Sequence, residues 1–453
     1  MSGLPLIWSE DLDVPLAWRA GQPVSRRQYL ADVQALAERL HERGEVLNLS
    51  ADRYRFAVGL GAAMLRGQPN LMPPNHTPET VASLCKLFPD IYGLVDEGDN
   101  RFALPTLALL AAPAAEPSAQ AKAPYVAADA VTAQVLTSGS TGSPVPHAKL
   151  WGLLVRNTAA GAERLAEHMN RADLVGVALV ATVPAQHMYG FESSVLIALL
   201  GGAAFDTERP FYPADIVRVL ERVPRPRMLV TTPLHLRTLL ESGLALPSLD
   251  LIVCATAPLS PQLASRAEAE MAAPLMEIYG CTEAGQVATR RTTAGPEWQV
   301  FRGLQLAGNG EHCVISGGHV PEPTPLADVL EVIDAQHFRL LGRSNDLINI
   351  AGKRSSLSHL NHHLNRVEGV RDGALWLPPE KQADGAEVVR LVAFVVAPGL
   401  TREHILAALR LRVDAAFLPR RVVFVPELPR DPTGKLPAAR LAQLAAEWLS
   451  DKS

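Results

Sequence analysis

A run of glycine and hydroxyl side chains from residue 137 to residue 144 (TSGSTGSP) could bind an anion. Gly139 and Gly142 permit positive φ angles and close approach of the backbone, so that successive N–H groups can surround a phosphate. Further donors are the hydroxyls of Thr137, Ser138, Ser140 and Thr141. A mobile Gly/Ser loop is the alternative, but the run follows an apolar strand-like segment, and ligands gather at the carboxyl ends of such strands. The run therefore predicts a phosphate-binding loop.

Two common nucleotide-binding patterns are missing from the sequence. A Walker A loop ends in Gly-Lys-Ser/Thr, which does not occur after Gly142, and no complete GxGxxG pattern is present. A P-loop kinase and a dinucleotide-dependent enzyme are therefore disfavoured. The formal net charge of −5 gives no general attraction to nucleic acid or anionic lipid, so we expect no nucleic-acid partner.

The composition is typical of a large packed protein with reduced thiols. Hydrophobic residues make up 48% of the 453 positions and charged residues 20%. The four cysteines are widely spaced and form no CxxC pair, which favours a reducing compartment. The start, MSGLPLIWSEDLD, lacks the basic and apolar regions of a signal peptide. Apolar stretches such as 195–205 are shorter than the roughly 20 residues of a membrane span. We expect a cytoplasmic protein without a membrane span.

Apolar runs alternate with amphipathic stretches, and the strands and helices that this pattern predicts must hold the candidate phosphate-binding loop in place. Strands are expected at 131–136, 174–183, 228–232 and 251–255, and helices at 27–40, 151–168 and 262–272. Such alternation predicts an α/β fold with much parallel sheet. The Ala/Pro-rich segment 111–125 predicts a loop or linker. We expect a large N-terminal domain over 1–344 and a small, mobile α+β C-terminal domain over 345–453.

Four segments occur in an order that is typical of one enzyme family. TSGSTGSP is followed by 278–283 (IYGCTE), 342–346 (GRSND) and 428–436 (LPRDPTGKL), with Asp328 between the second and third. Together they resemble the adenylate-forming superfamily, which holds acyl-CoA synthetases, luciferases and the adenylation domains of peptide synthetases. The resemblance implies that ATP activates a carboxylic acid as an acyl-adenylate, that pyrophosphate leaves, and that the acyl group passes to a thiol.

The resemblance also implies a role for individual residues. A carboxylate that attacks the α-phosphorus approaches a polyanion, so positive charge and donors must offset the repulsion. Lys435 would bridge the carboxylate and the α-phosphate, Thr282 would donate to the α-phosphate, and Glu283 would hold Mg²⁺, a hard cation for a carboxylate oxygen. Tyr279 would stack on adenine and Asp328 would accept from the ribose hydroxyls. The remaining nucleotide-binding positions are Ala257, Pro258, Gly280, Cys281 and Arg343.

The sequence departs from the family pattern at three positions. Val145 stands where a lysine normally follows the phosphate loop, and Lys149 could replace that lysine from a longer loop. Asn345 stands at the hinge, where Asp or Lys is usual, and Asn349 replaces a frequent lysine. These departures indicate an outlying branch of the family.

The family's small domain rotates between the two half-reactions, and the carried-over hinge is Asn345. In the conformation for thioester formation, the segment 351–354 (AGKR) would face the site. Gly352 would leave room for a slender thiol arm, with Lys353 beside it. Lys435 would then swing away.

The acyl site is expected in the segment 184–191 (PAQHMYGF), where a strand ends and a helix begins. His187 matches a family position that gates the acyl group, and Cys281 is interpreted as a packing residue because no base accompanies it. The expected walls of the site are Tyr189, Gly190, Phe191, Cys254, Ala255 and Gly280.

The segments 46–57 and 66–75, together with Pro146 and His147, resemble the short ligases of aryl polyene pigment pathways, including xanthomonadin. The resemblance implies a hydroxybenzoate-like acid and the phosphopantetheine thiol of a holo acyl carrier protein. Carrier proteins are usually acidic, and docking charges could come from Lys353, Arg354, Arg420, Arg421 and Arg430. A solvated charged face is the alternative.

Three other functions stay open. An aryl- or fatty-acyl-CoA ligase would use free CoA as the thiol. A catalytically inactive nucleotide-binding homologue is favoured by Val145 and Asn345 but opposed by Thr282, Glu283 and Lys435. A phosphotransferase would release ADP, and the missing Walker A lysine argues against it.

Overall fold

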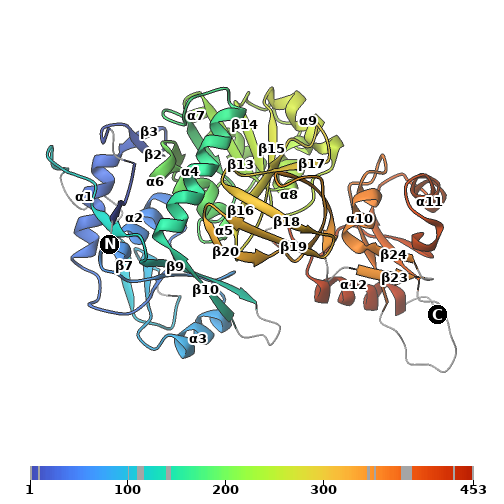
Figure 1. Cartoon of the computed structure of the whole chain (residues 1–453), viewed down its shortest axis with the longest axis horizontal. Helices are drawn as coiled ribbons and strands as arrows, with labels where there is room; N and C mark the ends of the chain where they lie inside the picture. Colours follow the sequence, from blue (N-terminus) through green and yellow to red (C-terminus); the bar gives the residue numbers. More distant parts are fainter. Residues whose placement is uncertain are drawn as a thin grey trace.

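The computed structural model of the chain consists of two sheet-containing lobes followed by a smaller C-terminal part (Figure 1). The structure describes residues 3–8, 11–99, 101–109, 117–138, 144–343, 347–350, 353–378, 390–431 and 434–450.

The first lobe is built on a six-stranded sheet. In spatial order its strands are β10 (Pro144–Leu150), β9 (Val131–Ser138), β5 (Asn70–Met72), β4 (Val46–Asn48), β6 (Tyr92–Asp96) and β7 (Thr106–Leu109). Every neighbouring pair is parallel except β9 and β10, which form an antiparallel hairpin. The helices of this lobe are α1 (Arg26–Ala37), α2 (Arg53–Leu65) and α3 (Pro78–Leu87). A short antiparallel pair, β1 (Gly3–Pro5) and β8 (Tyr125–Ala127), lies beside it.

The second lobe contains an eleven-stranded sheet. In spatial order its strands are β21 (Asp328–Val332), β22 (His337–Arg343), β17 (Glu297–Val300), β16 (Gly285–Arg290), β15 (Leu275–Cys281), β14 (Leu251–Cys254), β13 (Arg227–Thr231), β11 (Ala178–Ala181), β12 (Ala204–Asp206), β2 (Pro15–Arg19) and β3 (Gln22–Ser25). The run from β15 to β2 is parallel and the flanking strands are antiparallel. Strands β11 and β14 are buried along their whole length, as expected for parallel strands covered on both faces.

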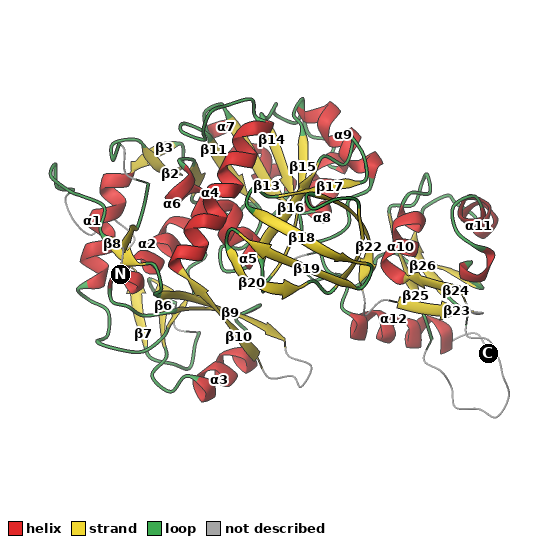
Figure 2. Cartoon of the chain, viewed as in Figure 1, coloured by secondary structure: helices red, strands yellow, loops and turns green. Residues whose placement is uncertain are grey.

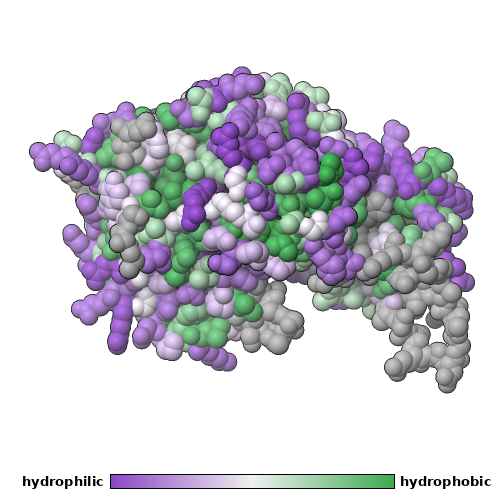
Figure 3. Space-filling view, in the orientation of Figure 1, coloured by the Kyte–Doolittle hydropathy of each residue, from purple (hydrophilic) through white to green (hydrophobic). Residues whose placement is uncertain are grey.

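Helices cover this sheet (Figure 2). They are α4 (Trp151–His168), α5 (Met188–Gly190), α6 (Ile197–Gly201), α7 (Pro213–Arg222), α8 (Pro233–Glu241) and α9 (Pro261–Met271), with a π-helix, η1 (Phe191–Leu196), between α5 and α6. A three-stranded antiparallel sheet, β18 (Leu304–Asn309), β19 (His312–Gly317) and β20 (Val320–Pro325), completes the lobe. Polar side chains cover much of the face in view, with smaller apolar patches between them (Figure 3).

The C-terminal part has its own sheets and its own buried clusters around Leu364 and Phe394. Its elements are β23 (Leu347–Ile350), β24 (Lys353–Ser356), α10 (Leu357–Asn365), β25 (Asp372–Trp376), β26 (Val392–Val396), α11 (Arg402–Arg410), a 3₁₀ turn η3 (Ala415–Phe417), β27 (Arg421–Phe424) and α12 (Ala438–Ser450). This is the smaller α+β unit that the change of pattern near residue 343 predicts. The boundary at residue 344 and the hinge at Asn345 stay predictions, since residues 344–346 lie outside the described ranges.

The α/β fold expected from the sequence is confirmed, and one strand differs from the expectation. The helix expected at 151–168 has those bounds, and the helix expected at 262–272 is α9. The strand expected at 174–183 is only β11, because residues 174–177 form a turn with a hydrogen bond from Val177 N–H to Leu174 O (3.0 Å). Within the described residues, no helix is long and apolar enough to cross a membrane.

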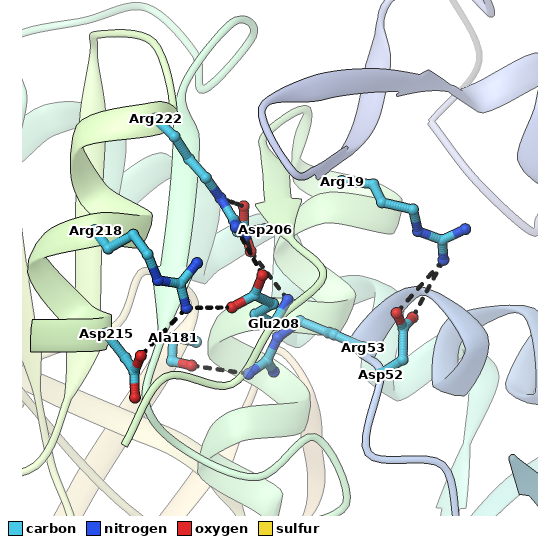
Figure 4. Close-up of polar contacts among 9 residues, drawn as sticks. All are labelled: Arg19, Asp52, Arg53, Ala181, Asp206, Glu208, Asp215, Arg218 and Arg222. Atoms are coloured by element: carbon cyan, nitrogen blue, oxygen red, sulfur yellow. Dashed lines mark hydrogen bonds and ion pairs between the residues drawn. The ribbon is translucent and has the colours of Figure 1, made fainter. Parts of the chain in front are cut away.

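A buried arginine joins the two lobes. Arg53, at the start of α2, is 2% exposed, and its guanidinium donates to the carbonyls of Ala181 (3.0 Å) and Val183 (2.9 Å) and to Ser194 Oγ (2.6 Å). Burial lowers the pKa of Arg53 to about 10. Nearby ion pairs tie the end of β12 to α7, notably Asp206 with Arg222 at 2.6 Å (Figure 4). Arg53 therefore fixes the end of β11 against η1, on the segment that carries His187.

Candidate active site

The candidate site lies where parallel strands of the second lobe end. Strands β11, β13, β14 and β15 run in one direction and end at residues 181, 231, 254 and 281. Because the carboxyl ends of parallel strands meet at one edge of a sheet, the segments that follow them come together there. Those segments carry His187, Ala257, Pro258, Thr282 and Glu283, which the sequence separates by up to about a hundred positions.

His187 is held in one orientation by the first lobe. Its Nε2 lies 2.9 Å from the carbonyl oxygen of Pro74, and because a carbonyl only accepts, Nε2 carries the proton. Burial lowers the pKa of His187, the hydrogen bond to Pro74 opposes this shift, and the positive charge of Lys435 adds to it. The imidazole is therefore neutral near pH 7, with Nδ1 as an acceptor.

Two glycines allow the tight turns of the site. A Cβ on Gly190 would lie 2.0 Å from the carbonyl oxygen of Pro184, and a Cβ on Gly280 would lie 2.3 Å from that of Gly285. Both distances are far inside van der Waals contact, so only glycine fits either position. These glycines allow close backbone contacts near His187 and Thr282, and their expected role as walls of the acyl site stays a prediction.

The other expected acyl-site residues are largely buried. Phe191 is fully buried, Cys254 is 1% exposed and Ala255 is 8% exposed. Tyr189 donates to the carbonyls of Thr231 (3.1 Å) and Val253 (3.0 Å), so its hydroxyl joins the ends of β13 and β14. Burial raises the pKa of Tyr189, which stays protonated. Its contact with an acyl group stays a prediction.

The turn that carries Ala257 and Pro258 contains a strained residue. Thr256 has a φ of +82°, which a β-branched residue adopts only when its surroundings impose it. Such strain costs about 1–3 kcal/mol and is concentrated at ligand-binding and catalytic sites. The strain at Thr256 supports a ligand-binding role for this turn.

Tyr279 and Asp328 are joined by a buried hydrogen bond. The Tyr279 hydroxyl lies 2.7 Å from Asp328 Oδ2, and the two residues are 8% exposed each. The Tyr279 ring packs against Trp298 and Phe338, with centroids 5.8 and 5.6 Å away. Asp328 pairs with Arg343 in the register of β21 and β22, so three expected nucleotide-binding residues are neighbours.

Lys149 reaches the Thr282–Glu283 turn from β10. Its ammonium donates to the carbonyl of Thr282. Burial lowers the pKa of Lys149, and the negative charges of Glu192 and Glu283 oppose that shift. The expectation that Lys149 would reach the site from a longer loop is wrong, because the hairpin pairs Lys149 with Ala133 in regular register.

Glu283 suits a magnesium ion that is bound mainly by phosphates. Its carboxylate is exposed, and the described part of the chain contains no group of three or more His, Cys, Asp or Glu that could hold a metal. Mg²⁺ in nucleotide sites usually takes one or two carboxylates and completes its shell with phosphate oxygens and water. Cys281 has a pKa raised to about 11 by burial, so it is a protonated thiol, in line with a packing role.

A braced loop of the C-terminal part presents Lys435. Asp431 Oδ1 accepts from the backbone N–H of Lys435 (3.0 Å), and Arg430 donates to the carbonyl of Gly434 (2.9 Å). A Cβ on Gly434 would lie 3.5 Å from Cβ of Leu234, so this loop meets the start of α8. Arg430 is ion-paired with Asp372, so it is not the free docking charge that the sequence suggested.

Several expected site residues lie outside the description. The residues outside the described ranges are Gly139, Ser140, Thr141, Gly142, Asn345 and Gly352. Only the backbone is described for Thr137, Ser138, Arg343, Lys353 and Arg354. Ser138 and Pro144 pair across the β9–β10 hairpin, so the expected phosphate loop connects these two strands.

Sequence interpretation missed three buried polar groups near the site. His76 has a pKa lowered to about 4 by burial, and the positive charges of Arg209 and Arg101 add to that shift. Glu192 accepts from Asn157 and lies in η1, within a run of residues that is otherwise mostly apolar. A carboxylate inside an apolar helix is the signal that could have drawn attention to Glu192.

Comparison with known proteins identifies relatives of this chain. A model of the AMP-binding enzyme family matches residues 96–311. The 4-coumarate–CoA ligase of Rhodobacter capsulatus is 30% identical over 316 residues, which cover 68% of this chain and 76% of that protein. The 4-chlorobenzoate–CoA ligase of an Arthrobacter species is 24% identical over 368 residues, or 70% of this chain and 66% of that protein.

Solved structures share the fold over nearly the whole chain. ATP-bound MatB from Rhodopseudomonas palustris superposes with a TM-score of 0.77 at 17% identity and covers 96% of both chains. The o-succinylbenzoate CoA synthetase of Bacillus subtilis, in complex with an acyl-adenylate, has a TM-score of 0.78 at 15% identity and covers 97% of this chain and 98% of its own. The chain belongs to the AMP-binding enzyme family. It is an AMP-forming acid–thiol ligase, which uses ATP to adenylate a carboxylic acid.

Proposed function

We propose that this enzyme adenylates an aromatic, hydroxybenzoate-like carboxylic acid and passes the acyl group to the phosphopantetheine thiol of an acyl carrier protein. One observation carries the adenylation chemistry. Lys435 acts electrostatically on His187, at the sheet edge that also carries Thr282 and Glu283. A cation, a hydroxyl donor and an exposed carboxylate near one sheet edge would suit attack on a polyphosphate.

In the proposed reaction, the acid's carboxylate attacks the α-phosphorus of ATP, and pyrophosphate leaves. Lys435 lies between the two anions and offsets their repulsion, while Thr282 donates to an α-phosphate oxygen. Glu283 would hold Mg²⁺, which supplies positive charge on the phosphates when it is bound. Asp328 accepts from the ribose and Tyr279 lines the adenine site. His187, neutral and fixed by Pro74, shapes the entry of the acyl group.

Two lines of support point to an aromatic acid. The curated relatives include ligases named for 4-coumarate and 4-chlorobenzoate. The expected acyl site also carries aromatic and small residues, among them Tyr189 and Ala255, which suit a flat ring. The Tyr189 hydroxyl shares its one proton between two backbone carbonyls, so it could contact a hydroxyl on the substrate ring only as an acceptor.

The proposal that the acceptor is a carrier-protein thiol rests on the resemblance to aryl polyene ligases. Such an acceptor would imply a role in pigment biosynthesis. Arg420 and Arg421 are exposed on the C-terminal part and could face an acidic carrier protein. The second candidate is an aryl-CoA ligase, and it is favoured by the names of the same relatives. In both cases the C-terminal part would turn about Asn345, so that Gly352 and Lys353 face the thiol arm and Lys435 withdraws.

The test is acid-dependent release of pyrophosphate, measured with a panel of benzoates, cinnamates and fatty acids. We expect release with hydroxybenzoates and little with fatty acids. Free CoA and a holo acyl carrier protein are then supplied separately, and thioester formation is followed by mass spectrometry. Thioester with CoA but not with the carrier protein would replace the first candidate by the second. No pyrophosphate release with any acid would contradict the adenylation step itself.

A further inference from the structure

A buried carboxylate next to the Thr282–Glu283 turn has no role in the proposed reaction. Glu192 is 4% exposed and accepts a hydrogen bond from the side-chain amide of Asn157. Burial raises the pKa of Glu192 to about 7, and Lys149 and Asn157 oppose the shift. A buried carboxylate is expensive unless a cation and hydrogen bonds compensate it. Its presence in a fully buried helix therefore calls for a physical reason.

The backbone beyond Glu283 is shaped around this carboxylate. Gly285 has a φ of +76°, and a Cβ there would lie 2.8 Å from Glu192 Oε1 and 3.2 Å from Asn157 Nδ2. Any larger residue would push into the Glu192–Asn157 pair and would also be strained at that φ. Gly285 follows Glu283 by two positions, so Glu192 lies directly against the turn that carries the expected metal-binding carboxylate.

Lys149 is the cation between these groups. Its side chain leaves β10, is mostly buried, and donates to the carbonyl of Thr282. The negative charges that act on it include Glu192 and Glu283. The charge of Glu192, on the π-helix, thus acts on the same ammonium that binds the carbonyl of Thr282, whose side chain would donate to a phosphate.

We propose that Lys149 is a phosphate-binding cation of this enzyme, which acts in place of the lysine that Val145 replaces, and that Glu192 and Asn157 are its positioning residues. The inference rests on the proposed place of the phosphates beside Thr282 and Glu283. An ammonium on a flexible stem can leave a single carbonyl for a phosphate oxygen, because a charge-assisted bond to phosphate is stronger than one to a neutral carbonyl. Glu192 limits how far the ammonium can move.

Nucleotide binding without any acid tests this inference separately from the choice of substrate. The affinities of ATP and AMP are measured by calorimetry for wild type, Lys149→Met, Lys149→Arg, Glu192→Gln and the Lys149→Met/Glu192→Gln double variant. Lys86→Met, an exposed lysine on α3, is the matched control. Lys149→Met should weaken ATP binding on the order of tenfold or more, and AMP binding much less, because AMP lacks two of the phosphates. Lys149→Arg should retain part of the preference for ATP.

Glu192→Gln keeps the shape of the side chain and removes its charge. It should weaken ATP binding less than Lys149→Met does, and it should have no further effect when Lys149 is already methionine. Wild-type affinities for both ATP and AMP in Lys149→Met would overturn the phosphate role. A Glu192→Gln effect that persists in full in the double variant would overturn the positioning role. Thermal unfolding shows whether Lys149→Met folds. If it does not, the inference is overturned when both Lys149→Arg and Glu192→Gln keep the wild-type ratio of ATP affinity to AMP affinity.

Discussion

The guanidinium of Arg430 forms a two-point ion pair with the carboxylate of Asp372, through Nε at 2.7 Å and a terminal nitrogen at 2.8 Å. A third nitrogen of Arg430 donates to the carbonyl of Gly434, the residue before Lys435. Asp372 lies on β25, so the sheet of the C-terminal part holds the loop that carries Lys435. The same carboxylate also acts electrostatically on Arg237 of α8, in the second lobe.

This brace predicts that Arg430 acts through Lys435. Arg430→Ala should lower the rate of adenylation on the order of tenfold, because a loosened loop places the ammonium less accurately. Arg430→Lys should recover little, since an ammonium cannot form the two parallel bonds that a guanidinium forms. Acid-dependent pyrophosphate release measures the effect, and Arg420→Ala, an exposed arginine of the same part, is the control. An adenylation rate that stays at the wild-type level in Arg430→Ala would contradict the brace.

Lys435 itself should matter in only one half-reaction. Lys435→Ala should lower adenylation about 10²-fold or more, since one charged donor to the transition state is lost. Transfer from a chemically prepared acyl-adenylate to the thiol should stay at the wild-type rate, because Lys435 is withdrawn in that posture. Single-turnover assays of each half-reaction measure the effects on adenylation and on acyl transfer separately. Lys122→Ala is the control for loss of an exposed lysine. An equal loss of rate in both half-reactions would contradict the model of two domain conformations.

The parts of the fold that could be predicted from the sequence are those encoded locally. The amphipathic period over α4 and the apolar run of β14 are each continuous in the chain, so both elements were expected within a residue of their ends. The motif at Thr282 and Glu283 and the loop at Lys435 are likewise contiguous.

Convergence of distant segments could not be predicted in this way. Asn157 on α4 contacts Glu192 on a π-helix, and Lys149 on β10 contacts the carbonyl of Thr282, so both contacts depend on how separate elements pack. The hydrogen bond from His187 to Pro74 crosses between lobes, and the ion pair of Arg430 with Asp372 spans 58 positions. No local pattern carries such pairings, because they follow from sheet order and from the choice of rotamers.

Asp328 should determine whether the enzyme distinguishes ribose from a sugar without hydroxyls. Asp328→Asn should weaken ATP binding on the order of tenfold, the loss expected when hydrogen bonds to a charged acceptor become neutral ones. Wild type should bind 2′,3′-dideoxy-ATP more weakly than ATP, and Asp328→Asn should lose most of that difference. Tyr279→Phe, which removes the hydroxyl 2.7 Å from Asp328 Oδ2 and leaves the carboxylate, is the matched comparison. A variant that keeps the wild-type ratio of the two affinities would show that Asp328 does not contact the ribose.

His319 predicts a loss of stability in mild acid. It is 6% exposed, and its Nε2 donates to the carbonyl of Gln286 (2.8 Å). Burial first, opposed by the hydrogen bond to Gln286, lowers its pKa from 6.5 to about 4. The unfolded chain therefore binds more protons than the folded chain between these two values, so the free energy of unfolding falls as the pH drops through this window. From pH 7 to pH 5 this one histidine should cost roughly 2 kcal/mol.

Urea unfolding at several pH values, for wild type and His319→Gln, measures that contribution. Glutamine does not titrate and can still donate to the carbonyl of Gln286. The variant therefore separates the effect of protonation on stability from the effect of losing the hydrogen bond. The stability of His319→Gln should fall less steeply below pH 6.5 than that of wild type, so the two curves should be closest near neutral pH and separate in acid. His337→Gln is the control, because it removes a histidine whose side chain is 40% exposed. Parallel curves for wild type and His319→Gln would mean that His319 either is protonated in the folded protein or reaches water when charged.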